Sequence, residues 1–165
     1  MNADAFRQFY NYHFTENRKI WNSYVTPLSY EQFTQDRAYS QGSVRNQILH
    51  LMAADESWFS ELQNIKPSEP LPSAHFDDRK NIRARWDNVE QNMRNYLAKL
   101  QDAMLFDAPI EEPEEDRILS VWQVLLHVVN HGTDHRAQLL RLLNDFGLKT
   151  TSQDYIFYIF DNLPK

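Results

Sequence analysis

Glycine is scarce in this sequence, occurring only three times in 165 residues. Tight turns between β-strands depend on glycine, because a residue without a Cβ can adopt backbone conformations that other residues avoid. A chain with so few glycines cannot supply the many hairpins of a β-sandwich or barrel. The sequence therefore predicts long helices, and its length suits one compact domain over residues 1–165.

Apolar side chains recur at spacings of three and four over four long segments, the pattern of amphipathic helices. We predict these helices at about residues 3–24, 44–63, 76–103 and 120–146. Prolines at position 27 and in residues 64–75 and 107–116 separate the segments, because proline cannot continue a helix. Packed together, the four apolar stripes predict an all-α fold, a four-helix bundle.

Two capping-box motifs mark helix starts. Residues 29–32 read Ser-Tyr-Glu-Gln and residues 120–123 read Ser-Val-Trp-Gln, so in each motif a serine and a glutamine can satisfy free backbone amides. The first motif predicts a short extra helix after the first long one. The apolar block at 155–160 predicts a second short helix at the C-terminus, packed across the bundle.

Charge and composition exclude several classes of protein. The formal net charge is −6, and the six acids of residues 107–116 account for all of it, so we expect no nucleic-acid contact and a solvated acidic segment. The chain has no cysteine, so any metal must use histidine and oxygen ligands. With no signal peptide and no apolar run near the roughly 18 residues of a membrane span, we expect a soluble, cytoplasmic protein without membrane contact.

Three histidines lie one turn apart on the last long helix: His127, His131 and His135. They occupy core-facing positions, where burying each imidazole without a partner would cost roughly 2 kcal/mol or more. Two imidazoles at i and i+4 can bind one cation, but three in line span about 12 Å of helix axis and cannot share one ion. Two interpretations are open: one pair binds a metal, or the histidines are hydrogen-bonded core residues. The pattern favours the metal site.

A further ligand has to come from another helix, and His50 on the second long helix is the candidate. On a helical wheel His50 falls about 120° from the centre of the apolar stripe, at the margin of the core. The wheel leaves two alternatives open, a ligand or a surface histidine. Small neighbours such as Ala54 and Ser57 would leave volume for a pocket beside a metal.

The last helix offers two possible histidine pairs, and we interpret His131 and His135 as the ligand pair. Gly132 removes a side chain there, where a substrate or another helix could approach. His127 is then a packing residue or a support for the ligands. His13, on the apolar stripe of the first helix, is interpreted as a hydrogen-bonded core residue.

Segments 46–58 and 127–138 together resemble the DinB/YfiT-like superfamily of metalloenzymes, and the resemblance covers essentially the whole chain. It implies a four-helix bundle of up-down-down-up order, in which His50, His131 and His135 hold a divalent ion such as zinc or nickel. It also implies a homodimer, and an enzyme that transfers low-molecular-weight thiols such as bacillithiol or mycothiol. Ala137 stands where the family often has glycine, which adds one methyl group and should not disturb the ligands.

Three hypotheses for the function follow. The first two are enzymes that act on a small-molecule substrate. The first is a metal-dependent thiol S-transferase, in which a metal-activated thiol cosubstrate attacks an electrophile. The second is a metal-dependent hydrolase that uses metal-bound hydroxide, with Asp55, Glu56 or Asp134 as the general base. The third is a non-catalytic bundle that binds metal or a partner.

Several other residues have a simpler interpretation. The four tryptophans at helical spacing are predicted to be core residues: Trp21, Trp58, Trp86 and Trp122. Arg136 and Gln138 could orient an anionic substrate or contact a second subunit, but a solvated helix face is favoured.

Overall fold

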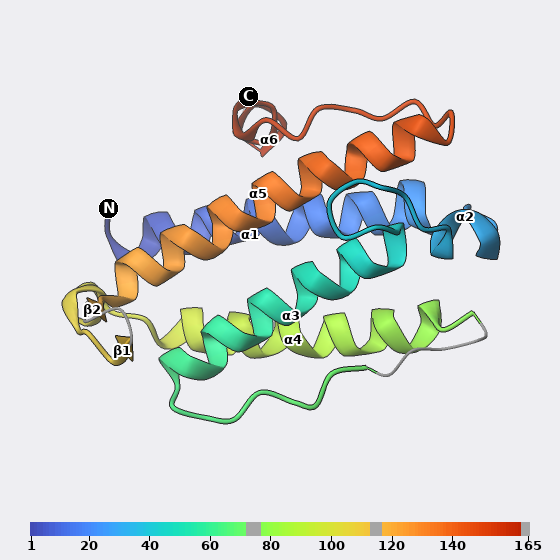
Figure 1. The fold of residues 1–165 in the computed structure, drawn as a ribbon. Coiled ribbons are helices and arrows are strands. Elements are labelled where there is room, and N and C mark those ends of the chain that lie inside the picture. Colours follow the sequence, from blue (N-terminus) through green and yellow to red (C-terminus); the bar gives the residue numbers. More distant parts are fainter. Residues whose placement is uncertain (72–76, 113–116, 163–165) are drawn as a thin grey trace.

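The computed structural model describes residues 1–71, 77–112 and 117–162. Within these residues the chain is mostly helical, with one small sheet (Figure 1). The long helices are α1 (Ala3–Ile20), α3 (Val44–Leu62), α4 (Arg79–Lys99) and α5 (Val121–Asp145). The shorter elements are a π-helical turn (Trp21–Val25), α2 (Tyr30–Thr34), a 3-10 turn (Asp102–Phe106), β1 (Ile110–Glu112), β2 (Arg117–Leu119) and α6 (Tyr155–Asn162).

The long helices lie side by side and share one hydrophobic core (Figure 1). Helix α5 packs against α1 and α3, and α4 packs against the same two helices. Their apolar stripes supply the interior side chains, which include Phe6, Tyr10, Ile48, Leu51, Ile82, Met93, Leu125 and Leu139. The helical fold predicted from the periodicity is confirmed, and the small sheet is an addition that the sequence did not predict.

Both capping-box motifs form as predicted. The amide of Gln32 donates to the Ser29 hydroxyl, and the amide of Ser29 donates to the Gln32 side chain, at 3.1 and 3.0 Å. At the start of α5, the amide of Ser120 donates to the Gln123 side chain at 2.9 Å. These bonds satisfy amides that have no partner within the helix, so the starts of α2 and α5 are set locally.

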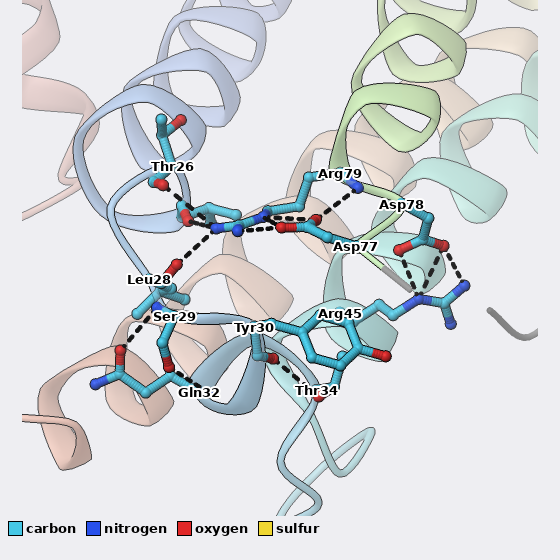
Figure 2. A network of polar contacts seen from close by, with 11 residues as sticks. Thr26, Leu28, Ser29, Tyr30, Gln32, Thr34, Arg45, Asp77, Asp78 and Arg79 are labelled. Atoms are coloured by element: carbon cyan, nitrogen blue, oxygen red, sulfur yellow. Dashed lines mark hydrogen bonds and ion pairs between the residues drawn. The ribbon is translucent and has the colours of Figure 1, made fainter. Parts of the chain in front are cut away.

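The first helix ends differently from the prediction. The α-helix stops at Ile20, and the chain continues as the π-helical turn to Val25. The Arg79 guanidinium donates to the carbonyls of Val25 and Leu28, at 3.2 and 2.7 Å (Figure 2). Because Arg79 lies more than fifty residues further along the chain, local sequence gave no sign of this contact.

Helix α4 is shorter than predicted at both ends. The expected start at Phe76 lies outside the described residues, and the helix begins at Arg79. The carboxylate of the preceding Asp78 binds the buried Arg45 on α3, with 2.6 Å between Nη2 and Oδ2 (Figure 2). At the other end, Leu100 adopts an extended backbone after Lys99, and a separate 3-10 turn follows.

The acidic segment is only partly the solvated loop that composition predicted. Strand β1 pairs antiparallel with β2, with Ile110 opposite Leu119. Ile110 is buried, whereas Glu111 is exposed. Residues 113–116 lie outside the described residues. Strands of three residues are too short for an alternating pattern to be recognised in the sequence.

The tryptophan prediction holds for two of the four residues. Trp21 and Trp86 are buried, with ring centroids 6.1 Å apart. Trp58 is half-buried, and Trp122 is 37% exposed, so the core assignment is wrong for Trp122. Trp122 is the second residue of α5 and lines a surface pocket together with Phe6 and Phe106.

Helix α6 confirms the short helix predicted at 155–160, but it lies on the surface. Tyr155 packs edge-on against Phe9 and Tyr12 of α1, with ring centroids 5.0 and 5.1 Å apart. Its apolar outer face remains exposed. Within the described parts of the chain, every helix falls short of the length and apolar character that a membrane span requires.

Candidate metal centre

The structure brings together the three histidines predicted as ligands. His50 projects from α3, and His131 and His135 project from adjacent turns of α5. The Nε2 atom of His50 lies 3.2 Å from Nε2 of His131 and 3.1 Å from Nε2 of His135. All three side chains are half-buried, so His50 is not the free surface histidine that the helical wheel allowed.

The arrangement of these nitrogens fits a cation. Each Nε2 carries either one proton or one lone pair, so the Nε2 of His50 can form only one of its two short contacts as a hydrogen bond at a time. A central ion satisfies all three lone pairs at once. Tetrahedral ligation by nitrogens about 2.0–2.1 Å from zinc separates them by about 3.3–3.4 Å, close to the separations found here.

The surroundings of His131 and His50 favour the neutral form of these two imidazoles, which is the form that binds metal. Burial, followed by the neighbouring imidazoles of His135, His50 and His127, lowers the pKa of His131 to about 4. Burial and the His135 imidazole also lower the pKa of His50. His131 is therefore neutral near pH 7, with a lone pair available for a divalent ion.

Gln47 contacts His135, one of the predicted ligands, on the side of the ring away from the other two histidines, a contact that helical spacing did not predict. It is fully buried, and its amide nitrogen lies 2.7 Å from Nδ1 of His135 and donates to the His135 carbonyl at 3.2 Å. Ser40 donates to the other end of the same amide at 2.9 Å. One signal was present, because Gln47 lies one turn before His50 on α3.

His127 lies beside the triad without joining it. Its side chain is exposed, and its ring centroid lies 5.7 Å from that of His131 and 5.1 Å from that of Trp58. Among the described residues, the histidine group that could hold a metal contains His50, His131 and His135 but not His127. The core-facing position predicted for His127 is therefore wrong, and its ring contacts the triad from outside, at His131.

Each of the three carboxylates considered as general bases has a side-chain partner outside the triad. Asp55 is buried, with Oδ2 3.1 Å from Nε2 of His13. Glu56 binds Arg85 at 2.7 Å. Asp134 is exposed and accepts a hydrogen bond from Gln138 at 2.9 Å.

Arg136 is not on a solvated helix face, so that prediction is wrong. Its side chain has no exposed surface and contacts His13, which is also fully buried and hydrogen-bonded as predicted. The space left by Gly132 is filled by His13 of α1, so another helix, rather than a substrate, approaches at this point.

Fold and site together define a helical protein with a three-histidine cluster between two of its long helices. The chain matches the model of the DinB family over residues 1–163 and belongs to that family. It is also similar to "Protein DinB" of Bacillus subtilis (strain 168), with 26% identity over 165 residues, 96% of this chain and 95% of that protein. The resemblance noted in the histidine segments is thereby confirmed.

Proposed function

We propose that His50, His131 and His135 hold a divalent metal ion, and that the protein is a metal-dependent enzyme transferring a low-molecular-weight thiol to an electrophile. The convergence of three Nε2 atoms carries this proposal. Three neutral imidazoles would hold a divalent ion such as zinc or nickel without cancelling its charge, and the ion would favour the deprotonated form of a thiol or water bound to it.

The existing partners of the three candidate carboxylates support thiol transfer over hydrolysis, because none of these carboxylates is a free general base. A bound metal lowers the pKa of water to about 7 and holds a thiol as its thiolate, so either nucleophile could form; hydrolysis additionally uses a free carboxylate as a general acid or base for proton transfer with the substrate. Asp55 and Glu56 are bound to His13 and Arg85, and Asp134 is exposed and bound to Gln138. Since the chain has no cysteine, the thiol has to come from a cosubstrate.

The metal is tested first, by elemental analysis of the purified protein. The proposal predicts about one divalent ion per chain, lost in a His131→Ala variant. His127→Ala is the matched control, because His127 lies one turn away on the same helix and contacts His131 from outside the triad. Wild-type protein that binds no divalent ion, or a His131→Ala variant that retains it, contradicts the proposal.

The reaction is tested with a panel of low-molecular-weight thiols and electrophilic acceptors. Turnover that requires both the thiol and the metal supports the transferase. Turnover in water alone supports the hydrolase. A metal-loaded protein with no turnover on either panel, whose fold collapses when the metal is removed, favours a structural ion.

The finer arrangement of the helices is also a proposal. We infer that α1, α3, α4 and α5 form the up-down-down-up bundle that the family resemblance implies, and that the chain forms a homodimer. The mutual packing of these helices supports the bundle. Light scattering coupled to size-exclusion chromatography tests the dimer, and a mass of about one chain contradicts it.

A further inference from the structure

A buried polar network joins the metal-binding segment of α5 to three other parts of the chain. Its centre is Arg136, which follows His135 directly and has no exposed surface. The guanidinium donates four hydrogen bonds of 2.9–3.1 Å, to Nδ1 of His13, Oδ1 of Asn17, Oγ1 of Thr133 and Oε1 of Gln153.

Arg136 faces Nδ1 of His13, and both Asp55 and the side-chain nitrogen of Asn17 lie 3.1 Å from Nε2 of the same ring. An arginine always donates, so Nδ1 of His13 is the unprotonated acceptor and its Nε2 carries the proton. Because the Asn17 nitrogen can only donate, a protonated Nε2 bonds Asp55 and not Asn17. A continuous series from Asp55 through His13 to Arg136 therefore links α3, α1 and α5, with opposite charges at its two ends.

This network is a costly way to fill a helical core. The four acceptors of the Arg136 guanidinium are all neutral groups, and the carboxylates of Asp55 and Glu16 act on it electrostatically without a hydrogen bond to it. Replacing buried charges with apolar side chains of similar volume is often neutral or stabilising. Arg136 is therefore poorly explained by stability alone.

Gln153 attaches the C-terminal segment to this network. Its side chain accepts from Arg136 and donates to the carbonyl oxygen of Thr133 at 3.0 Å. Its own carbonyl accepts from the Tyr12 hydroxyl at 2.6 Å. Thr133 lies midway between the two ligand histidines of α5, so Gln153 contacts the helix backbone within the turn that carries them.

We propose that Arg136, His13 and Gln153 are positioning residues for the histidine triad. They hold the turn of α5 between His131 and His135 against α1, and Asp55 extends this link to the helix that carries His50. The segment before α6, which carries Gln153, thus helps to position the metal-binding histidines. This inference rests on the proposed metal site.

The test compares Gln153→Leu with Tyr24→Phe, using Co²⁺ as the probe. Tyr24 contacts Thr151 of the same C-terminal segment, with 3.1 Å between the two hydroxyls, so Tyr24→Phe loosens this segment without touching the network. We expect Gln153→Leu to weaken Co²⁺ binding about ten-fold and to change the visible spectrum of the bound ion. We expect Tyr24→Phe to lower thermal stability with Co²⁺ affinity within about two-fold of wild type.

A conservative variant distinguishes positioning from simple destabilisation. Gln153→Glu keeps an acceptor for Arg136 but loses the amide that donates to the Thr133 carbonyl, so any affinity it recovers relative to Gln153→Leu comes from the Arg136 contact alone. Equal Co²⁺ affinity and an unchanged spectrum in Gln153→Leu would overturn the inference, whatever the change in thermal stability. Failure of Gln153→Glu to recover any affinity would overturn positioning by the Arg136 contact alone and leave the Thr133 contact as the required one.

The failure of the metal site itself can be told apart from the failure of the network. Wild-type protein that binds no Co²⁺ or other divalent ion refutes the proposed function. The imidazole ¹⁵N resonances of the metal-free protein then decide the inference. Shifted His131 and His135 signals in Gln153→Leu, but not in Tyr24→Phe, support positioning by the network, and unchanged signals overturn it.

Discussion

Adding one methyl group at Gly132 tests how tightly α1 and α5 approach beside the triad. A Cβ built on Gly132 would lie 2.4 Å from Cε1 of His13, 2.8 Å from its Nδ1 and 3.1 Å from Nη1 of Arg136. His13 has no free space to move, because it is fully buried and both of its ring nitrogens are hydrogen-bonded. Gly132→Ala must therefore displace His13 or separate the two helices.

The expected magnitude follows from two opposing effects. Alanine favours a helix over glycine by about 1 kcal/mol, which alone would stabilise the variant. Overpacking costs about 1–3 kcal/mol, and losing a hydrogen bond to a charged group costs about 1.5–3 kcal/mol. We expect a net loss of about 2–4 kcal/mol in the free energy of unfolding, measured by urea denaturation.

Two companion variants make the Gly132→Ala result specific. Ala137→Gly, on the exposed face of the same helix, should lose only the propensity difference of about 1 kcal/mol. In a His13→Ala background the clash is absent, so adding Gly132→Ala should be neutral or stabilising by up to about 1 kcal/mol. A Gly132→Ala single variant as stable as wild type would refute the close approach of His13.

Two further predictions concern single side chains. Gln47→Leu removes the amide beside His135 and should weaken metal binding about ten-fold in a competition assay with a chelating dye; unchanged affinity would show that the amide has no such role. Burial raises the pKa of Glu56, but hydrogen bonds from Ser68 and Arg85 outweigh it and lower the pKa overall. Because the folded-state pKa is the lower one, Glu56 stabilises the fold above its unfolded pKa and loses this effect as pH falls through the folded pKa. Glu56→Gln should therefore lower the urea midpoint at neutral pH and leave it unchanged in strong acid, and an equal loss at both pH values would contradict this pairing.

The parts of the structure that local sequence controls were predictable. The long helices follow from apolar spacing, and the starts of α2 and α5 follow from serine–glutamine pairs three residues apart. The same periodicity placed His131 and His135 on one face of α5. These features depend on residues within one or two turns of each other.

The parts that distant residues control were not predictable from spacing. Arg136 was expected in solvent because an isolated arginine on a helix usually lies there, yet its partners on α1 precede it by 119 and 123 residues. On α3, His50 lies at the margin of the apolar stripe. It joins the histidine cluster only because α5 packs against α3. Family resemblance, rather than the helical wheel, predicted it as a ligand.

The central claim is that three imidazoles from two helices bind one divalent ion. X-ray absorption spectroscopy of the zinc-loaded protein tests this most directly, because it reports the type, number and distance of the ligands. The account predicts three imidazole nitrogens at about 2.0–2.1 Å in the wild type and two in a His50→Ala variant. A zinc ion surrounded only by oxygen ligands, or an unchanged imidazole count in His50→Ala, would contradict it.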